Sequence, residues 1–352
     1  MSNQKLNLGI VGLGWPGERH AEGIHASETG ELYACADSSD ERRENFVKTY
    51  APKKAFASYE EMLADPALDA VITCLPNFLH FPTSLAALGA GKHVFCEKPP
   101  TINAAEMRVL QEESTRRGLV YFFGRQARFS GAMLAARQLI ADGRLGPVYF
   151  GKTVFIRSRG IPGGVGGWFT DKARSGGGAL IDLGVHALDS AWFAMGTPKP
   201  ISVSAQVFRN FAHTVSLPTF DVDDAAYGMI RFENGGLIQF EVSWAANLPD
   251  DVPAHVYYGQ ELVNTTLYGQ KATLRLNPLA LFEDQNGTLT KVEIEPQGGA
   301  EDNRFAWQMQ NFLDAIAGKA EPVNNAQQAV YLMEMLDAIY TSSATGREVP
   351  LA

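Results

Sequence analysis

Short continuous apolar runs, separated by segments with helical periodicity, fill the first third of the chain. Such runs are typical of strands that are buried on both faces of a sheet. The runs lie at 6–12, 32–37, 69–76, 92–98 and 119–124. Helices are expected at 16–29, 40–50, 58–64, 78–90 and 103–117. Asn103 and Glu106 form a capping-box-like start to the last of these helices, and Gly118 is expected to end it. This regular alternation predicts a parallel sheet that helices cover on both faces.

The pattern changes after residue 125, where apolar and polar residues alternate with a period of two. This period is typical of antiparallel strands with one buried face. Strands are expected at 201–210, 225–232 and 236–245, with further short strands near 254–294. The Asn-Gly pair at 234–235 indicates a hairpin. Helices at about 131–142, 179–195, 304–317 and 325–343 complete an α+β region.

Length and charge limit the class of protein. At roughly 100–200 residues per domain, 352 residues indicate two domains. A net charge of −9 disfavours binding to nucleic acid or to an anionic membrane, and no apolar run reaches the ~18 residues that could span a bilayer. The first residues lack the basic and apolar segments of a secretory signal, which favours a cytoplasmic protein.

Cysteine usage supports the same compartment. The three cysteines, Cys35, Cys74 and Cys96, lie in apolar segments, and none belongs to a C-x-x-C pair. A disulfide framework or a zinc site is therefore not expected.

A glycine motif follows the first predicted strand. Gly12, Gly14 and Gly17 form G-x-G-x-x-G, and the predicted helix begins directly after them. In dinucleotide-binding folds these glycines permit a tight turn, a close approach of the backbone to the pyrophosphate, and close packing of helix and strand. Asp37 ends the second predicted strand, where a carboxylate accepts hydrogen bonds from a ribose diol. The motif predicts a Rossmann domain.

The choice of cofactor depends on the same aspartate. Because the carboxylate of Asp37 repels a 2′-phosphate, NAD is favoured over NADP. Ser38, Arg42 and Arg43 leave NADP open, although both arginines are expected to be solvated.

Two further segments, "CLPNFLH" at 74–80 and "CEKPP" at 96–100, follow the next strands. Ligands of open parallel sheets bind beyond the carboxyl ends of the strands, so both segments are expected to line the cofactor cleft. The predicted cofactor-binding residues are Gly12, Gly14, Trp15, Gly17, Asp37, Leu75, Pro76, Asn77, His80, Glu97, Lys98 and Pro99.

Asp182 and His186 are four positions apart in "SGGGALIDLGVHALD", so they share one face of the predicted helix. A histidine can take the proton of an alcohol, an aspartate one turn away can orient it, and Lys98 can hydrogen-bond the oxygen. By spacing alone, an ordinary surface or helix-stabilising pair is favoured over a catalytic pair. A metal site is not expected, because Asp189 is the one adjacent ligand type. The glycines at 176–178 are expected to let the backbone approach a ligand.

Together, GxGxxG, Asp37, "CLPNFLH", "CEKPP" and "GGGALIDLGVHALD" resemble the Gfo/Idh/MocA oxidoreductase family over essentially the whole chain. The resemblance implies a Rossmann domain at 1–124. It also implies an α+β domain at 125–352 with a large, mainly antiparallel open sheet, the terminal helices being free to pack back on the first domain. The substrate is expected between the domains, and the protein is expected to form a homodimer or homotetramer.

The resemblance assigns Lys98, Asp182 and His186 as the catalytic trio. Further candidate substrate residues are Arg125, Trp168 and Phe169, the last two in a loop at 157–175 that resembles an active-site cover. Gly124 departs from the family's pattern, which often has asparagine at that position, and this weakens the assignment of Arg125.

The expected activity is an NAD-dependent oxidoreductase that acts on a secondary alcohol of a sugar, inositol or related polyol. Two alternatives stay open. Some relatives use NAD transiently to cleave glycosidic bonds, and others are thought to be regulators that bind the nucleotide without chemistry.

Overall fold

The computed structural model describes residues 5–163, 167–249, 251–255, 258–298 and 303–351. The chain forms two compact units. The first contains 1–129 and 302–330, and the second contains 130–301 and 331–352. The expected domain boundary between residues 124 and 125 stays a prediction. The two compact units do not show which segments fold independently as domains.

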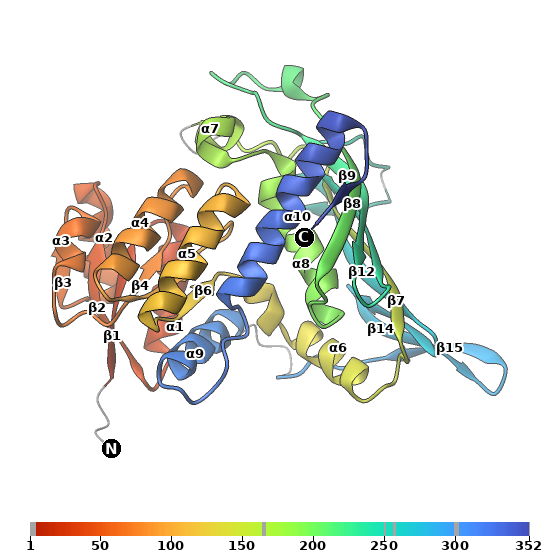
Figure 1. The fold of residues 1–352 in the computed structure, drawn as a ribbon, viewed down its shortest axis with the longest axis horizontal. Coiled ribbons are helices and arrows are strands. Elements are labelled where there is room, and N and C mark those ends of the chain that lie inside the picture. Colours follow the sequence, from red (N-terminus) through yellow and green to blue (C-terminus); the bar gives the residue numbers. More distant parts are fainter. Residues whose placement is uncertain (1–4, 164–166, 250, 256–257, 299–302, 352) are drawn as a thin grey trace. The chain divides into compact units, whose positions relative to one another are not determined.

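The first unit is built on a parallel sheet with the strand order β3-β2-β1-β4-β5-β6 (Figure 1). Its strands are β1 (Leu6–Val11), β2 (Gly30–Ala36), β3 (Lys54–Phe56), β4 (Ala70–Thr73), β5 (His93–Cys96) and β6 (Tyr121–Phe123). The direction of winding reverses between β1 and β4. Ligands of doubly wound sheets bind at the carboxyl ends of the strands beside such a reversal.

Helices cover the hydrophobic core of this sheet. One of them comes from the later segment 302–330, which belongs to the same unit. The helices are α1 (Trp15–His25), α2 (Asp40–Tyr50), α3 (Tyr59–Leu63), α4 (Asn77–Gly89), α5 (Ala104–Arg117), the 3₁₀ turn η1 (Gln126–Phe129) and α9 (Arg304–Ile316). α9 packs against α1, and Phe312 of α9 lies 5.5 Å from Phe95 and 5.6 Å from Phe122, measured between ring centroids. The parallel α/β prediction is confirmed.

Two details of the first unit differ from the prediction. The edge strand β3 was not expected, because Lys-Ala-Phe is too short and too polar for an apolar run. The helix predicted at 16–29 ends at His25, and Ser27 then bonds back to the Ile24 carbonyl oxygen to make a turn. By contrast, the predicted caps of α5 are correct, since Asn103 accepts a hydrogen bond from Glu106 N.

The second unit carries a large sheet with the order β15-β14-β13-β12-β7-β10-β9-β8-β16, and β11 pairs with β12. Among the described residues, its pairings are antiparallel except that of β10 with β7. The strands are β7 (Val148–Arg157), β8 (Pro200–Phe208), β9 (Ala225–Phe232), β10 (Leu237–Ser243), β11 (Ala254–His255), β12 (Gly259–Gly269), β13 (Ala272–Leu276), β14 (Leu279–Gln285), β15 (Thr288–Glu293) and β16 (Val349–Pro350). The mainly antiparallel sheet is confirmed, including the predicted β9–β10 hairpin.

Short helices accompany this sheet. They are α6 (Gly131–Ala141), the 3₁₀ turn η2 (Trp168–Thr170), α7 (Lys172–Ser175), the π-helical turn η3 (Leu180–Gly184), α8 (Val185–Ala194), the 3₁₀ turn η4 (Ala212–Thr214) and the C-terminal part of α10 (Ala326–Thr345). α8 packs against β7, β10 and β12. The side chains beneath it, such as Ile238, Phe240 and Val242, are fully buried. In the described part of the chain, no helix has both the length and the apolar character needed to cross a membrane.

Candidate functional site

The glycine loop joins β1 to α1 and packs against the loop after β4. Gly12 has a φ of +88°, and a Cβ at this position would lie 2.4 Å from the carbonyl oxygen of Cys74. At Gly17 a Cβ would lie 2.4 Å from the carbonyl oxygen of Gly12. Gly14 meets no such obstacle, since its nearest contact is 3.9 Å away. The loop therefore leaves its backbone open beside the N-terminus of α1, as the motif predicts.

Asp37 directly follows β2 and lies beside this loop. Its Oδ2 accepts a hydrogen bond from Leu13 N at 3.0 Å, and its Oδ1 accepts one from Ser39 N at 2.9 Å. Arg42 donates to both oxygens, from Nε at 3.0 Å and from Nη2 at 2.9 Å. Arg42 is thus exposed but ion-paired, and Arg43 Nη1 donates to the backbone oxygen of Asp37. Burial raises the pKa of Asp37, but the hydrogen bonds from Arg42, Leu13 and Ser39 outweigh it, so the pKa lies below its ordinary value.

The loop that carries Lys98 follows β5, at the same edge of the sheet as the glycine loop. Glu97 Oε2 accepts a hydrogen bond from Lys98 N at 3.0 Å, and Glu97 Oε1 lies 2.7 Å from His20 Nε2. Burial raises the pKa of Glu97, but His20 and the N–H of Lys98 lower it to below its ordinary value. The Lys98–Pro99 peptide bond is cis.

The loop after β4 leads into α4, which begins at Asn77. His80 is buried in this helix, and its ring bridges two carbonyl oxygens: Nδ1 lies 2.6 Å from Pro99 O, and Nε2 lies 2.7 Å from Leu75 O. The two segments expected to line a cofactor cleft are therefore held together. Because both ring nitrogens are engaged by the protein, His80 supports this cleft through its neighbours.

Asp182 and His186 occupy an unusual helix start in the second unit. The predicted continuous helix at 179–195 begins as the π-helical turn that contains Asp182, and α8 begins one residue before His186. Asp182 Oδ2 accepts a hydrogen bond from Trp244 Nε1 at 3.0 Å. The ring of His186 lies 6.2 Å from that of Phe155, and Asp189 is fully buried. Single-turn π-helices occur frequently at functional sites.

Gly177 and Gly178, before this turn, lie close to protein groups, which corrects the expectation that these two glycines make room for a ligand. A Cβ at Gly178 would lie 1.8 Å from Asp223 O, and one at Gly177 would lie 1.9 Å from the hydroxyl of Tyr340. Asp223 Oδ1 accepts hydrogen bonds from Gly178 N at 2.8 Å and from the Tyr340 hydroxyl at 2.7 Å, and Oδ2 accepts one from Leu180 N at 2.8 Å. A buried carboxylate therefore caps the helix start.

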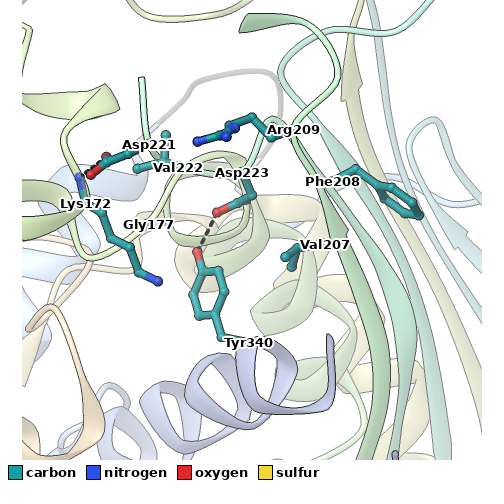
Figure 2. A pocket seen from close by; sticks show the side chains of 9 residues that line it. All are labelled: Lys172, Gly177, Val207, Phe208, Arg209, Asp221, Val222, Asp223 and Tyr340. Atoms are coloured by element: carbon teal, nitrogen blue, oxygen red, sulfur yellow. Dashed lines mark hydrogen bonds between the residues drawn. The ribbon is translucent and has the colours of Figure 1, made fainter. Parts of the chain in front are cut away.

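A pocket of about 230 Å³ lies beside this cap (Figure 2). Its lining residues are Lys172, Gly177, Val207, Phe208, Arg209, Asp221, Val222, Asp223 and Tyr340. Lys172 Nζ lies 5.5 Å from the centre of the Tyr340 ring, while Lys172 N donates to Asp221 at 2.7 Å. The pKa of Asp223 lies above its ordinary value. Burial raises it, and the hydrogen bonds that the carboxylate accepts offset this increase only in part. The pocket thus combines two cationic residues, Lys172 and Arg209, with two acidic ones, Asp221 and the capping Asp223.

Trp168 and Phe169 stack on each other, with ring centroids 3.9 Å apart, and residues 164–166 of their loop lie outside the described residues. Arg125 is fully buried, and its N–H donates to Gln308 Oε1 at 2.8 Å. Trp15 begins α1 and is exposed. Within the described ranges, no group of three or more His, Cys, Asp or Glu side chains is arranged to hold a metal ion.

Sequence reasoning missed three supporting residues. Trp244 is 62 positions from Asp182, and Asp223 is 45 positions from Gly178, so neither follows from local spacing. His20 lies on the buried face of α1, but nothing in the motif there indicates that its partner is Glu97.

Comparison with known proteins adds to this geometry. Residues 6–125 match the family described as "Oxidoreductase family, NAD-binding Rossmann fold", and residues 133–275 match the "GFO/IDH/MocA C-terminal domain". The chain is 31% identical to D-glucoside 3-dehydrogenase of Escherichia coli (strain K12), covering 100% of this chain and 99% of the relative. It is 27% identical to myo-inositol 2-dehydrogenase of Thermotoga maritima over 66% of each chain.

Among solved structures, the chain is similar to GenD2 from gentamicin A biosynthesis in complex with NAD. The TM-score is 0.81 at 25% identity, and the match covers 99% of this chain and 97% of that chain.

Proposed function

The chain belongs to the GFO/IDH/MocA family of NAD-binding oxidoreductases, and from that premise we propose that it moves a hydride between NAD and a secondary alcohol of a sugar, inositol or related polyol. The observation that carries the proposal is the meeting of the glycine loop, Asp37 and the Lys98 loop at one edge of the parallel sheet. The relatives named as glucoside and inositol dehydrogenases support the substrate class.

The residues of the first unit fit NAD. Gly12 permits the tight turn and Gly14 leaves the loop backbone accessible, so its N–H groups and the N-terminus of α1 can bind the pyrophosphate. Asp37 lies beside this loop and accepts hydrogen bonds from the ribose hydroxyls once Arg42 moves away. When bound, NAD supplies the nicotinamide ring that accepts the hydride.

Proton transfer is assigned to the chain's own side chains. His186 takes the proton of the substrate hydroxyl, and Lys98 hydrogen-bonds the same oxygen and favours its deprotonated form. Asp182 orients the imidazole, and Trp244 in turn restrains the Asp182 carboxylate. Trp168 and Phe169 are proposed to contact the sugar. Arg125 is left out of the proposal because its side chain is buried.

A panel of sugars and inositols tests the activity, with formation of reduced nicotinamide as the readout for NAD and NADP separately. Lys98→Ala and His186→Ala are expected to lower kcat by about 100-fold or more while the chain still binds NAD. Lys319→Ala and His25→Ala are matched controls, because both side chains are exposed and neither is assigned a role.

Three results would contradict the proposal. Full activity of both catalytic variants would remove the assigned mechanism. Sugar release without accumulation of NADH would indicate the glycosidase alternative, and tight NAD binding without any redox activity would indicate the regulator.

The second unit also supports a homo-oligomer. Phe208, Tyr227, Met229 and Leu262 are exposed on the face of the sheet that points away from α8. Large exposed apolar groups gathered on one face are typical of an interface, and we propose that a second copy of the chain covers them.

Three free cysteines are consistent with the reducing cytoplasm that we propose as the location of the protein.

A further inference from the structure

Two buried histidines flank the loop that carries Lys98. His20 from α1 has no exposed surface, and its Nε2 lies 2.7 Å from Glu97 Oε1. His80 from α4 is 1% exposed, and its Nδ1 lies 2.6 Å from Pro99 O. Both chain neighbours of Lys98 are thus contacted by a buried histidine. His20 contacts Glu97, and His80 contacts Pro99.

The bonding of His80 determines its protonation. Both of its ring nitrogens face carbonyl oxygens, those of Pro99 and Leu75, and a carbonyl oxygen only accepts hydrogen bonds. Both nitrogens must then carry hydrogen, which makes the ring an imidazolium. Burial lowers the pKa of His80, but the Cys96 thiol and the two carbonyl groups raise it, to about 9 on balance.

The contacts of Glu97 complete the arrangement. One oxygen of its carboxylate is hydrogen-bonded to the ring of His20. The other oxygen accepts a hydrogen bond from the backbone N–H of Lys98 at 3.0 Å. The N–H of Lys98 is thus held through Glu97, while the carbonyl group of the next residue is held by His80. The loop has no regular secondary structure, and these contacts fix its backbone on both sides of Lys98.

We propose that His20 and His80 are positioning residues, which hold the backbone on either side of Lys98 so that its ammonium group meets the substrate oxygen in one orientation. The inference rests on the proposed role of Lys98. Its physical reason is that misplacing a catalytic group by about 1 Å can cost on the order of 100-fold in rate. His80 also ties this loop to Leu75, so the segments after β4 and β5 keep one relative position.

A double-mutant cycle tests the coupling between His80 and Lys98. His80→Gln is expected to lower kcat about tenfold or more with a smaller change in KM, because the Lys98 ammonium group stabilises the negative charge that develops on the oxygen in the transition state more than the neutral hydroxyl of the bound substrate. In the Lys98→Ala background the same change is expected to lower kcat by less than about twofold, since the group that His80 positions is gone. Equal losses in both backgrounds would overturn the proposal.

His93→Gln is the matched control. His93 lies at the other end of β5, and its Nδ1 accepts the N–H of Val120 at 3.0 Å, so it supports the same sheet without contacting the Lys98 loop. Its replacement is expected to leave kcat unchanged. A loss of kcat equal to that of His80→Gln would show a general effect on the fold.

Two measurements remain decisive if His80→Gln does not fold. Nitrogen-15 NMR of the intact protein at neutral pH is expected to show a histidine ring with both nitrogens protonated, and a neutral His80 would overturn its part of the proposal. His20→Gln, which keeps a donor for Glu97, is expected to retain at least about five times more kcat than His20→Leu. Equal kcat in these two variants would overturn the part of His20.

The NMR result does not depend on the reaction. Full activity of Lys98→Ala, together with a doubly protonated His80, would refute the proposed role of Lys98 and leave the hydrogen bonding of the loop intact. Absence of any redox activity in the wild type would refute the proposed function itself.

Discussion

At the scale of single residues, the Asp37 carboxylate is saturated by four N–H groups, those of Leu13 and Ser39 and two from Arg42. The proposed binding of the ribose by Asp37 would therefore exchange at least one of these partners. Arg42 is the one whose side chain is exposed, so its displacement costs the least packing. If Asp37 holds the ribose as proposed, Arg42 would be the side chain available to meet a 2′-phosphate of NADP.

The first prediction concerns cofactor preference. Asp37→Asn is expected to weaken NAD binding by about 1–2 kcal/mol, because a charged acceptor is lost, and to improve the relative affinity for NADP. Titration of both cofactors against the purified protein measures the ratio. Asp40→Asn, an exposed neighbour, is the control, and an unaltered NAD-to-NADP ratio in Asp37→Asn would contradict the assignment.

The second prediction concerns pH. Since the pKa of His80 is raised from 6.5 to about 9 in the folded chain, its contribution to stability is fully present below pH 6.5 and is lost as the pH rises through about 9. The free energy of unfolding is expected to fall across this window by on the order of 3 kcal/mol more in the wild type than in His80→Gln. Chemical denaturation at a series of pH values measures the difference.

Other groups around His80 do not produce the same effect. Burial raises the pKa of the Tyr121 hydroxyl well above its ordinary value, and the pKa of Glu97 is lowered, so neither titrates between pH 6.5 and 9. Cys96 and Lys98 are present in both the wild type and His80→Gln. The difference in the free energy of unfolding between the two proteins therefore isolates the titration of His80. Parallel pH profiles of wild type and His80→Gln would show that His80 is neutral when folded.

At the scale of elements, the start of the Asp182–His186 helix is defined by close backbone contacts. Asp223 fits against the turn because Gly178 has no side chain, and the bonds from Gly178 N and Leu180 N then replace the helical partners that a first turn lacks. The orientation of Asp182 thus depends on a loop that precedes β9.

The third prediction compares two glycines. Gly178→Ala is expected to destabilise the protein by at least about 2 kcal/mol, because the new methyl group overlaps Asp223 O. Gly89→Ala, near the end of α4, is expected to stabilise it by about 0.5 kcal/mol, because a Cβ there meets no atom within 4 Å. Denaturant unfolding measures both, and similar values for the two variants would contradict this account of the helix start.

At the scale of the whole molecule, the sheet of the second unit presents two unlike faces. One is buried beneath α8, and the other combines the exposed apolar groups with an ion pair between Lys152 and Glu241 at 2.9 Å. Such a mixture of apolar and charged groups suits an interface between copies, because the charged groups disfavour non-specific aggregation.

The fourth prediction concerns assembly. Tyr227→Glu is expected to shift the protein to a monomer, because the introduced carboxylate would be buried in the interface without a partner, whereas the fold tolerates it on an exposed position. Light scattering after gel filtration measures the mass. Val109→Glu, an exposed apolar residue of α5, is the control, and a monomeric wild type would refute the interface.

Local pattern alone determined much of this protein. The apolar runs predicted the parallel strands except β3, and the period of two predicted β9 and β10, which the Asn-Gly pair joined into a hairpin. The motifs placed Gly12, Asp37 and Lys98 at strand ends. These features follow from neighbours in the chain, because strand and helix periods and turn residues are encoded over a few positions. The same locality explains why the cap of α5 was predictable.

Tertiary structure decided the contacts that join distant segments. The partner of Asp182 is Trp244, the glycines at 177 and 178 accommodate Tyr340 and Asp223, and His20 and His80 hold the Lys98 loop. The π-helical turn and the packing of α9 on the parallel sheet also belong here. Each depends on which surfaces meet after folding, and a sequence pattern with a period of a few residues carries no record of that meeting.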